Sequence, residues 1–286
     1  MARRKLKAEE IRFNLLALPS LIGFMFFFII PFGMSFYYSL VDRNFSGQFV
    51  GLQNYIDVIT SNIFQNAAMN TFGFILICVP LNIVIPLSLA LALGKISWLR
   101  NVFATIFLLP LVIPSGSIVF VWQAIFGLNG VINKLFFAAA PVSLLNISVS
   151  NVIIVIIFLW KNVGYNVVLF MAGLSFIPKE YYEIAQTEGS TPFKSLIHIT
   201  LVYLTPTFFL VFFLSIINSF KAFKEIYLLT GKYPNQSVYM LQHYINNQFL
   251  SMNYQKLAAA SYMLLFFVFL LIIVFFHLQR RFTRYL

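Results

Sequence analysis

Residues 177–206 read IPKEYYEIAQTEGSTPFKSLIHITLVYLTP, a polar stretch that lies between two strongly apolar runs. It holds Glu180, Glu183 and Glu188, three of the eight acidic residues of the chain. Of the 286 residues, 60% are hydrophobic and 9% are charged, whereas a soluble domain carries about 25% charge. We therefore expect an all-α integral membrane protein, in which this stretch forms a loop at the membrane surface.

Six apolar runs are long enough for membrane-spanning helices, which need roughly 20 residues each. They cover residues 14–40, 71–94, 102–126, 151–173, 197–219 and 257–278. A backbone in lipid must satisfy its own hydrogen bonds, and these runs lack the alternation of barrel strands, so we expect helices. The first run exceeds the apolar core of a signal peptide, which predicts a retained helix. The whole of 1–286 is then a single transmembrane domain.

The lysine and arginine residues predict the orientation of these helices. With the N-terminus in the cytoplasm, twelve basic residues fall on the cytoplasmic side and six on the outer side, which satisfies the positive-inside rule. Both termini are then cytoplasmic, and the loop 177–196 between the fourth and fifth helices is cytoplasmic too. Lipid head groups account for the net charge of +11 without a nucleic-acid partner.

The loop contains start and stop signals for two helices. Pro178 suits the first turn of a short helix, and Gly189 suits its end because glycine readily adopts the left-handed conformation. Thr191 followed by Pro192 predicts the cap and first turn of a second helix, which we expect to run without a break into the fifth span. The result is a rigid knob, either a well-capped polar loop or a docking element for a cytoplasmic partner.

This loop resembles the EAA loop of permease subunits of binding-protein-dependent ABC importers, of the carbohydrate-uptake type typified by the maltose system. The matching positions are Ile177-Pro178, Glu183, Ala185, Gly189 and Pro206, with Glu188 in place of an aspartate. Ile184, Ser190 and Val202 depart from the pattern, and the proline missing at 202 puts only a local kink in doubt. The segments FVGLQNYIDVI at 49–59 and FKAFKEIYLLTGKYP at 220–234 also resemble those permeases.

The resemblance implies a coupling helix that docks in a groove of a partner ATPase and drives alternating access. The residues implied to carry the coupling are Pro178, Glu183, Ala185, Glu188, Gly189 and Phe193. The implied partners are a second homologous permease in a heterodimer, two cytoplasmic ATPase subunits and an extracellular substrate-binding lipoprotein, in a bacterial cytoplasmic membrane. Because the chain lacks G-x-x-x-x-G-K-[S/T], ATP and Mg²⁺ belong to the partner ATPase, and we expect no cofactor, metal or catalytic residue here.

Polar side chains inside the spans are the candidates for the substrate pathway, because they are costly in lipid and tend to face a cavity or the bundle interior. They are Lys161, Asn162, Tyr165, Asn166, Tyr203, Asn218, Ser261 and Tyr262. A sugar needs amides, hydroxyls and an aromatic surface, which this set supplies. The alternative for each residue is a hydrogen bond between helices.

The charged residues separate the possible substrates and mechanisms. We expect all eight acids to lie outside the spans, which argues against an ion-coupled secondary transporter and against a polyamine site. A phosphate-bearing solute would need basic residues, and Lys161 is the only one expected inside a span. A sugar, either a monosaccharide or an oligosaccharide, therefore fits best, and the same importer for a solute such as glycerol 3-phosphate is the alternative.

Overall fold

The computed structural model describes residues 16–43, 47–94, 100–137, 140–146 and 149–283. These ranges form helices and turns without a strand, apart from an isolated bridge between Val41 and Phe49. Within these ranges, six helices are long and apolar enough to cross a membrane: Leu16–Ser39, Asn62–Leu93, Ser115–Phe136, Ser150–Ser175, Thr205–Thr230 and Tyr254–His277. The predicted all-helical membrane fold is thus confirmed for the described residues. The basic residues counted at Arg3, Arg4, Lys5, Lys7, Arg12, Lys95 and Arg284, and the start of the first run at residue 14, lie outside the described ranges.

The chain divides into two compact units, the first of which comprises Met1–Ser61 and Ile245–Phe267. Its described helices are the π-helical turn η1 (Met25–Ile29), α2 (Ile30–Ser39), α3 (Gln53–Ile59), most of α14 (Leu241–Leu250) and the first half of α15 (Tyr254–Thr283). The amide of Asn54 fixes α3 to the end of α2, because its Nδ2 donates to the carbonyls of Ser39 (3.0 Å) and Val41 (2.9 Å).

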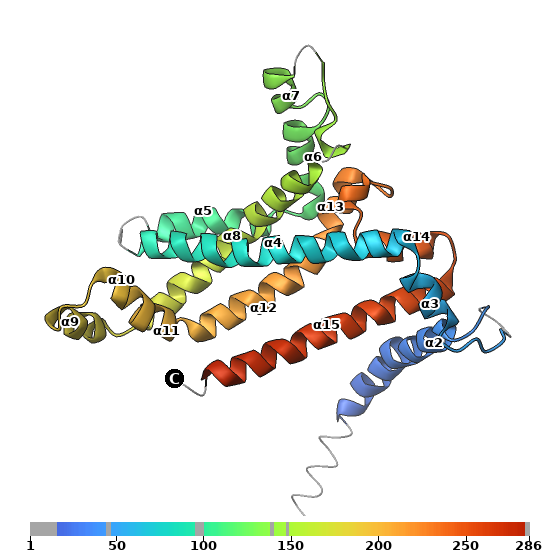
Figure 1. Cartoon of the computed structure of the whole chain (residues 1–286), viewed down its shortest axis with the longest axis horizontal. Coiled ribbons are helices and arrows are strands. Elements are labelled where there is room, and N and C mark those ends of the chain that lie inside the picture. Colours follow the sequence, from blue (N-terminus) through green and yellow to red (C-terminus); the bar gives the residue numbers. More distant parts are fainter. Residues whose placement is uncertain (1–15, 44–46, 95–99, 138–139, 147–148, 284–286) are drawn as a thin grey trace, which may run out of the picture. The chain divides into compact units, whose positions relative to one another are not determined.

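The second unit comprises Asn62–Tyr244 and Val268–Leu286. Four helices pack beside one another in it: α4 (Asn62–Leu93), α5 (Arg100–Val112), α8 (Ser150–Ser175) and α12 (Thr205–Lys221) (Figure 1). Their shared core includes Ala90, Val167, Phe170, Leu204 and Val211. The short helices α9 (Lys179–Thr187) and α10 (Pro192–Ser195) lie at one end of this bundle, and α13 (Phe223–Thr230) lies at the other (Figure 1).

The predicted run 102–126 is not one helix in the structure. It contains α5 and α6 (Ser115–Phe126), and α6 is followed by α7 (Val131–Phe136) and the 3₁₀ turn η2 (Leu144–Asn146). Pro114 precedes α6 with φ −58° and ψ 140°, and a proline disfavours helical geometry in the residue before it. Hydropathy averaged over the run does not reveal this break, because the few small residues after Pro114 lie between two strongly apolar segments.

The second helix of the loop continues as helical backbone into the fifth span, as expected, but it is not a regular α-helix throughout. After α10 the chain forms a π-helical turn, η3 (Leu196–Thr200), then α11 (Leu201–Tyr203) and a turn at Leu204 before α12 begins. Helical structure also continues beyond residue 219, since the candidate span ends at Thr230. Likewise α4 begins at Asn62, earlier than the predicted start at 71. The apolar runs therefore locate these helices but do not show where each one begins and ends.

The segment after α13 packs against the start of α4. It contains the 3₁₀ turn η4 (Gln236–Val238), and the N–H of Leu241 donates to the Thr71 hydroxyl at 2.9 Å. His243 is fully buried here, and its Nδ1 accepts from the N–H of Met240 at 3.1 Å. Burial lowers the pKa of His243 to about 4, because an apolar environment disfavours the charged imidazole.

Candidate functional site

The end of α9 is a turn set by one glycine. Gly189 has φ +76°, and the N–H of Ser190 donates to the carbonyl of Ala185 at 2.8 Å while the N–H of Gly189 donates to that of Gln186 at 3.1 Å. This is the Schellman arrangement, in which a residue with positive φ closes a helix. The predicted glycine turn is confirmed.

The start of the next helix also follows its local sequence. The hydroxyl of Thr191 accepts from the N–H of Lys194 at 3.3 Å, and Pro192 occupies the first turn of α10. Pro178 stands at the N-cap of α9, just before the first turn in which it was expected. The sequence therefore specifies the helix–turn–helix through contacts made within a few residues.

The surface of this helix–turn–helix is open. No residue of α9 is buried, Glu183 and Glu188 are exposed, and 69% of Phe193 is accessible. A cleft of about 540 Å³ lies between α9 and the start of the fifth span. It is lined by Tyr181, Ile184, Ala185, Glu188, Ser190, Lys194, Ser195, His198 and Ile199. Of the predicted coupling residues, the structure places Ala185 and Glu188 in this cleft.

Two tyrosines attach α9 to the fifth span. The Tyr182 hydroxyl lies 2.8 Å from that of Thr200, which is buried in η3. The rings of Tyr181 and Tyr203 pack with their centroids 5.2 Å apart. Tyr203, predicted for the substrate pathway, thus lies beside α9. A displacement of α9 would be transmitted to η3 and α11 through these contacts.

A second concave site lies where α5, α8, α12 and α13 meet. The cavity has a volume of about 260 Å³. Its lining residues are Leu111, Ile154, Ile157, Phe158, Lys161, Asn162, Asn218, Lys221, Ala222, Glu225 and Ile226. The structure therefore brings together three of the predicted pathway residues, Lys161, Asn162 and Asn218, and adds Lys221 and Glu225.

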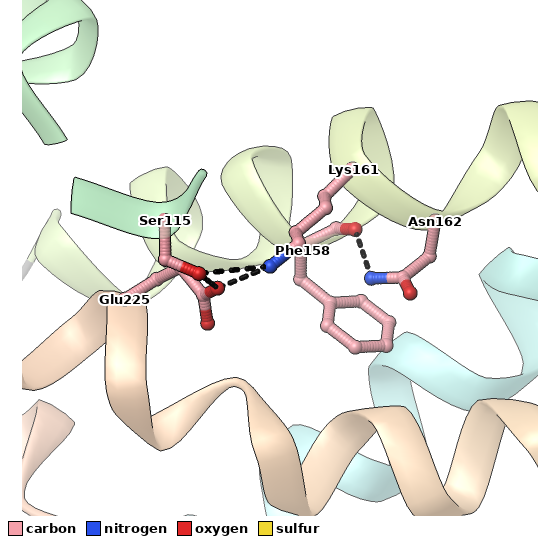
Figure 2. Close-up of polar contacts among 5 residues, drawn as sticks. All are labelled: Ser115, Phe158, Lys161, Asn162 and Glu225. Carbon is pink, nitrogen blue, oxygen red and sulfur yellow. Dashed lines mark hydrogen bonds and ion pairs between the residues drawn. The ribbon is translucent and has the colours of Figure 1, made fainter. Parts of the chain in front are cut away.

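Lys161, which is partly exposed, and Glu225, which is buried, form an ion pair in the wall of this cavity (Figure 2). The Ser115 hydroxyl donates to the same carboxylate oxygen, Oε1, at 2.7 Å, and the Lys161 ammonium reaches that hydroxyl at 3.4 Å. Glu225 is only 5% exposed and belongs to the candidate span Thr205–Thr230. The expectation that every acid lies outside the spans is therefore wrong.

One signal in the sequence could have suggested this pair, although it played no part in the expectation. A lysine within a span needs a partner, and Glu225 is the acid nearest to the end of the fifth apolar run. A polyamine site would need a carboxylate that is not already paired, and the Glu225 carboxylate is paired with Lys161. The ion pair, rather than the absence of acids from the spans, is therefore the argument against a polyamine substrate.

Asn166 lies against α4 and does not line the cavity. Its Nδ2 donates to the backbone carbonyl of Asn82 at 3.1 Å. That carbonyl lacks its usual helical donor, because the residue four positions on is Pro86, which has no N–H. The Asn82 side chain in turn donates to the Ser215 hydroxyl at 2.9 Å. Asn166 thus completes the hydrogen bonding of a proline-containing helix.

The remaining predicted pathway residues lie elsewhere. Tyr165 is half-buried in α8 and is not among the residues that line the cavity. Ser261 and Tyr262 belong to the first unit, where the Tyr262 hydroxyl donates to the carbonyl of Phe32 at 2.6 Å. Among the described residues, no three His, Cys, Asp or Glu side chains gather closely enough to hold a metal ion.

The profile of the family described as binding-protein-dependent transport system inner membrane component matches residues 82–285. The chain belongs to this family. The match includes α9, the cavity and the ion pair, so the resemblance drawn from the loop is confirmed. It makes the chain the permease subunit of a transport system and leaves the secondary transporter without support.

Curated relatives of this permease cover most of its length. It is 30% identical over 253 residues to the arabinooligosaccharides transport system permease protein AraP of Bacillus subtilis, and the alignment covers 85% of this chain and 80% of the relative. It is 32% identical over 238 residues to the trehalose/maltose transport system permease protein MalF of Thermococcus litoralis, covering 80% and 81%.

A solved structure shares the fold. A chain of a bacterial ABC transporter involved in the import of the acidic polysaccharide alginate superimposes with a TM-score of 0.81 at 20% identity, covering 97% of this permease and 98% of that chain.

Proposed function

We propose that this permease forms half of the translocation pathway of an ATP-driven importer for a saccharide, in a bacterial cytoplasmic membrane. The observation that carries the substrate class is the pair of relatives above, which are named for arabino-oligosaccharides and for trehalose and maltose and align with most of this chain. The cavity supports it, because Asn162, Asn218 and Glu225 offer amide and carboxylate groups beside the apolar surface of Phe158.

The exposed α9 is the proposed contact with the ATPase. Glu183 and Phe193 offer a charge and an apolar side chain to a groove, while Gly189 sets the angle of the turn. ATP and Mg²⁺ act in the partner ATPase. The contacts of Tyr181 and Tyr182 make α9 and the start of the fifth span move as one body, so that closure of the ATPases changes the access to the cavity.

The proposed assembly contains a second, related permease, two ATPase subunits and an extracellular binding protein. A binding protein is supported by the family description. One chain presents one such coupling helix, so two ATPase subunits require two permeases. In this assembly both termini and α9 lie on the cytoplasmic side, as the distribution of basic residues predicts.

Uptake into proteoliposomes that contain the complete complex, its binding protein and internal ATP tests this proposal. The solutes are maltotriose, arabinotriose, an alginate trisaccharide, glycerol 3-phosphate and spermidine. We expect ATP-dependent uptake of at least one saccharide and of neither other solute. Uptake of glycerol 3-phosphate or spermidine without any saccharide would refute the proposed substrate class.

A further inference from the structure

We infer that Glu225 is a specificity-determining residue of the cavity, whose carboxylate accepts hydrogen bonds from the hydroxyl groups of a neutral saccharide. Lys161 and Ser115 hold that carboxylate in position. The inference rests on the proposed function, in which a saccharide is the substrate. It adds which group of the permease recognises the saccharide and that the saccharide is uncharged.

The position of the carboxylate is fixed from two sides. Lys161 comes from α8 and Ser115 from the first turn of α6, and both contact Oε1 of Glu225, which comes from α13 (Figure 2). Three elements thus restrain one oxygen. An acceptor held in this way loses little conformational freedom when a ligand binds, which favours affinity and specificity.

The other oxygen of Glu225 is available to a ligand. Among the described residues, none donates a hydrogen bond to Oε2, and Figure 2 shows it directed away from Ser115 and Lys161. Asn162 adds a similar acceptor, because its Nδ2 donates to the carbonyl of Phe158 at 2.8 Å and leaves Oδ1 without a donor from the described part of the chain. These free acceptors suit hydroxyl groups, which are the donors that a saccharide carries.

The shape of the cavity fits the same ligand. Its volume of about 260 Å³ is just below the range of about 300–1,000 Å³ that is usual for small-molecule sites. One sugar residue is therefore a better match than a whole oligosaccharide. Phe158, Ile157 and Ile226 line the remaining wall, and such side chains pack against the C–H faces of a sugar ring.

The charges favour a saccharide without a carboxylate. The Lys161 ammonium is already paired with Glu225, so an anionic sugar that approached it would bring a second carboxylate beside the first. Two carboxylates around one ammonium repel each other. Lys221 also borders the cavity, but it is exposed and its charge is solvated.

The test measures sugar binding to the permease complex itself, so that the selectivity of the binding protein does not enter. The complex, without its binding protein, is placed in nanodiscs and equilibrated by dialysis with maltotriose, arabinotriose or an alginate trisaccharide. We expect at least one neutral trisaccharide to bind and the alginate trisaccharide not to bind. Binding of the alginate trisaccharide, or no binding of a neutral trisaccharide that the complex imports, overturns the inference but leaves a saccharide importer intact.

A double variant tests Glu225 directly. Lys161→Met with Glu225→Gln removes both charges and leaves no unpaired ion in the wall. We expect the affinity for the neutral trisaccharide to fall on the order of tenfold, because hydrogen bonds to a charged acceptor are stronger than those to an amide. Asp57→Asn, at a partly exposed acid of α3 whose carboxylate accepts from Gln53, is the matched control and should bind like the wild type.

Unchanged binding by an assembled double variant would show that the pair is only structural and would overturn the inference. If the double variant does not assemble, the comparison of neutral and anionic trisaccharides on the wild-type complex still decides. Failure of the proposed function has a different signature, since then no saccharide enters the proteoliposomes at all.

Discussion

Replacing Asn166 by alanine tests whether this residue supports α4 or lines the substrate pathway. Its Nδ2 is the donor that the structure supplies to the Asn82 carbonyl, which Pro86 leaves without a helical partner. Asn166 is 1% exposed, so water cannot replace the lost donor. Alanine avoids the overpacking that a larger apolar residue would cause at this position.

The size of the effect follows from the bond that is lost. An unsatisfied buried carbonyl costs about 1–3 kcal/mol, although hydrogen bonds between membrane helices are worth about 0.6 kcal/mol on average and about 1.7 at most. We expect Asn166→Ala to lower the free energy of unfolding by about 1–2 kcal/mol. Uptake per assembled complex should remain unchanged.

The physical cause can be isolated by a second substitution. Pro86→Ala restores an N–H that can donate to Asn82 within α4, so Asn166→Ala should then cost about 1 kcal/mol less than in the wild type. The control background is Pro80→Ala in the same helix. This substitution restores an N–H that cannot reach the Asn82 carbonyl, so the cost of Asn166→Ala should stay the same.

The assay is reversible unfolding in mixed micelles of SDS and a mild detergent, combined with uptake by the same preparation. An equal cost of Asn166→Ala with and without the Pro86→Ala substitution would refute the reasoning about the carbonyl. A loss of uptake with unchanged stability would instead return Asn166 to the substrate pathway.

Three further predictions concern single residues. Gly189→Val should reduce ATPase co-purification because β-branched residues resist positive φ, whereas Gly189→Asn should retain it; equal retention by both would contradict a role for the turn. Gly164→Ala should lower the thermal midpoint of the complex, because an added Cβ would overlap the carbonyl oxygen of Phe107 in α5, whereas Gly73→Ala meets open space and should not. His243 should make stability depend on pH: as pH falls from the ordinary pKa of 6.5 towards about 4, only the unfolded chain takes up the proton, so up to about 3 kcal/mol is lost. His243→Gln should remove that slope in unfolding curves, and an unchanged slope would be evidence against a buried neutral histidine.

Some features could be predicted from the sequence because they depend on neighbouring residues. Gly189 and Thr191 act on N–H and carbonyl groups within a few residues of themselves, and the structure contains both turns as expected. The apolar runs predicted the number of candidate spans, because the cost of burying charge in lipid depends on composition over about 20 residues. The division of the third run at Pro114 escaped this reasoning, because hydropathy does not register backbone geometry.

The sequence by itself determined the class of protein, the number of candidate spans and the exposed turn that follows α9. The tertiary structure alone decided that Lys161 meets Glu225, that Asn162 borders the cavity and that Asn166 faces α4 instead. The physical reason is that α8 is apolar around most of its circumference and sits in an apolar medium. Hydrophobicity therefore does not fix the rotation of such a helix about its axis, and Lys161 and Asn166 are oriented by partners that lie far away in the chain.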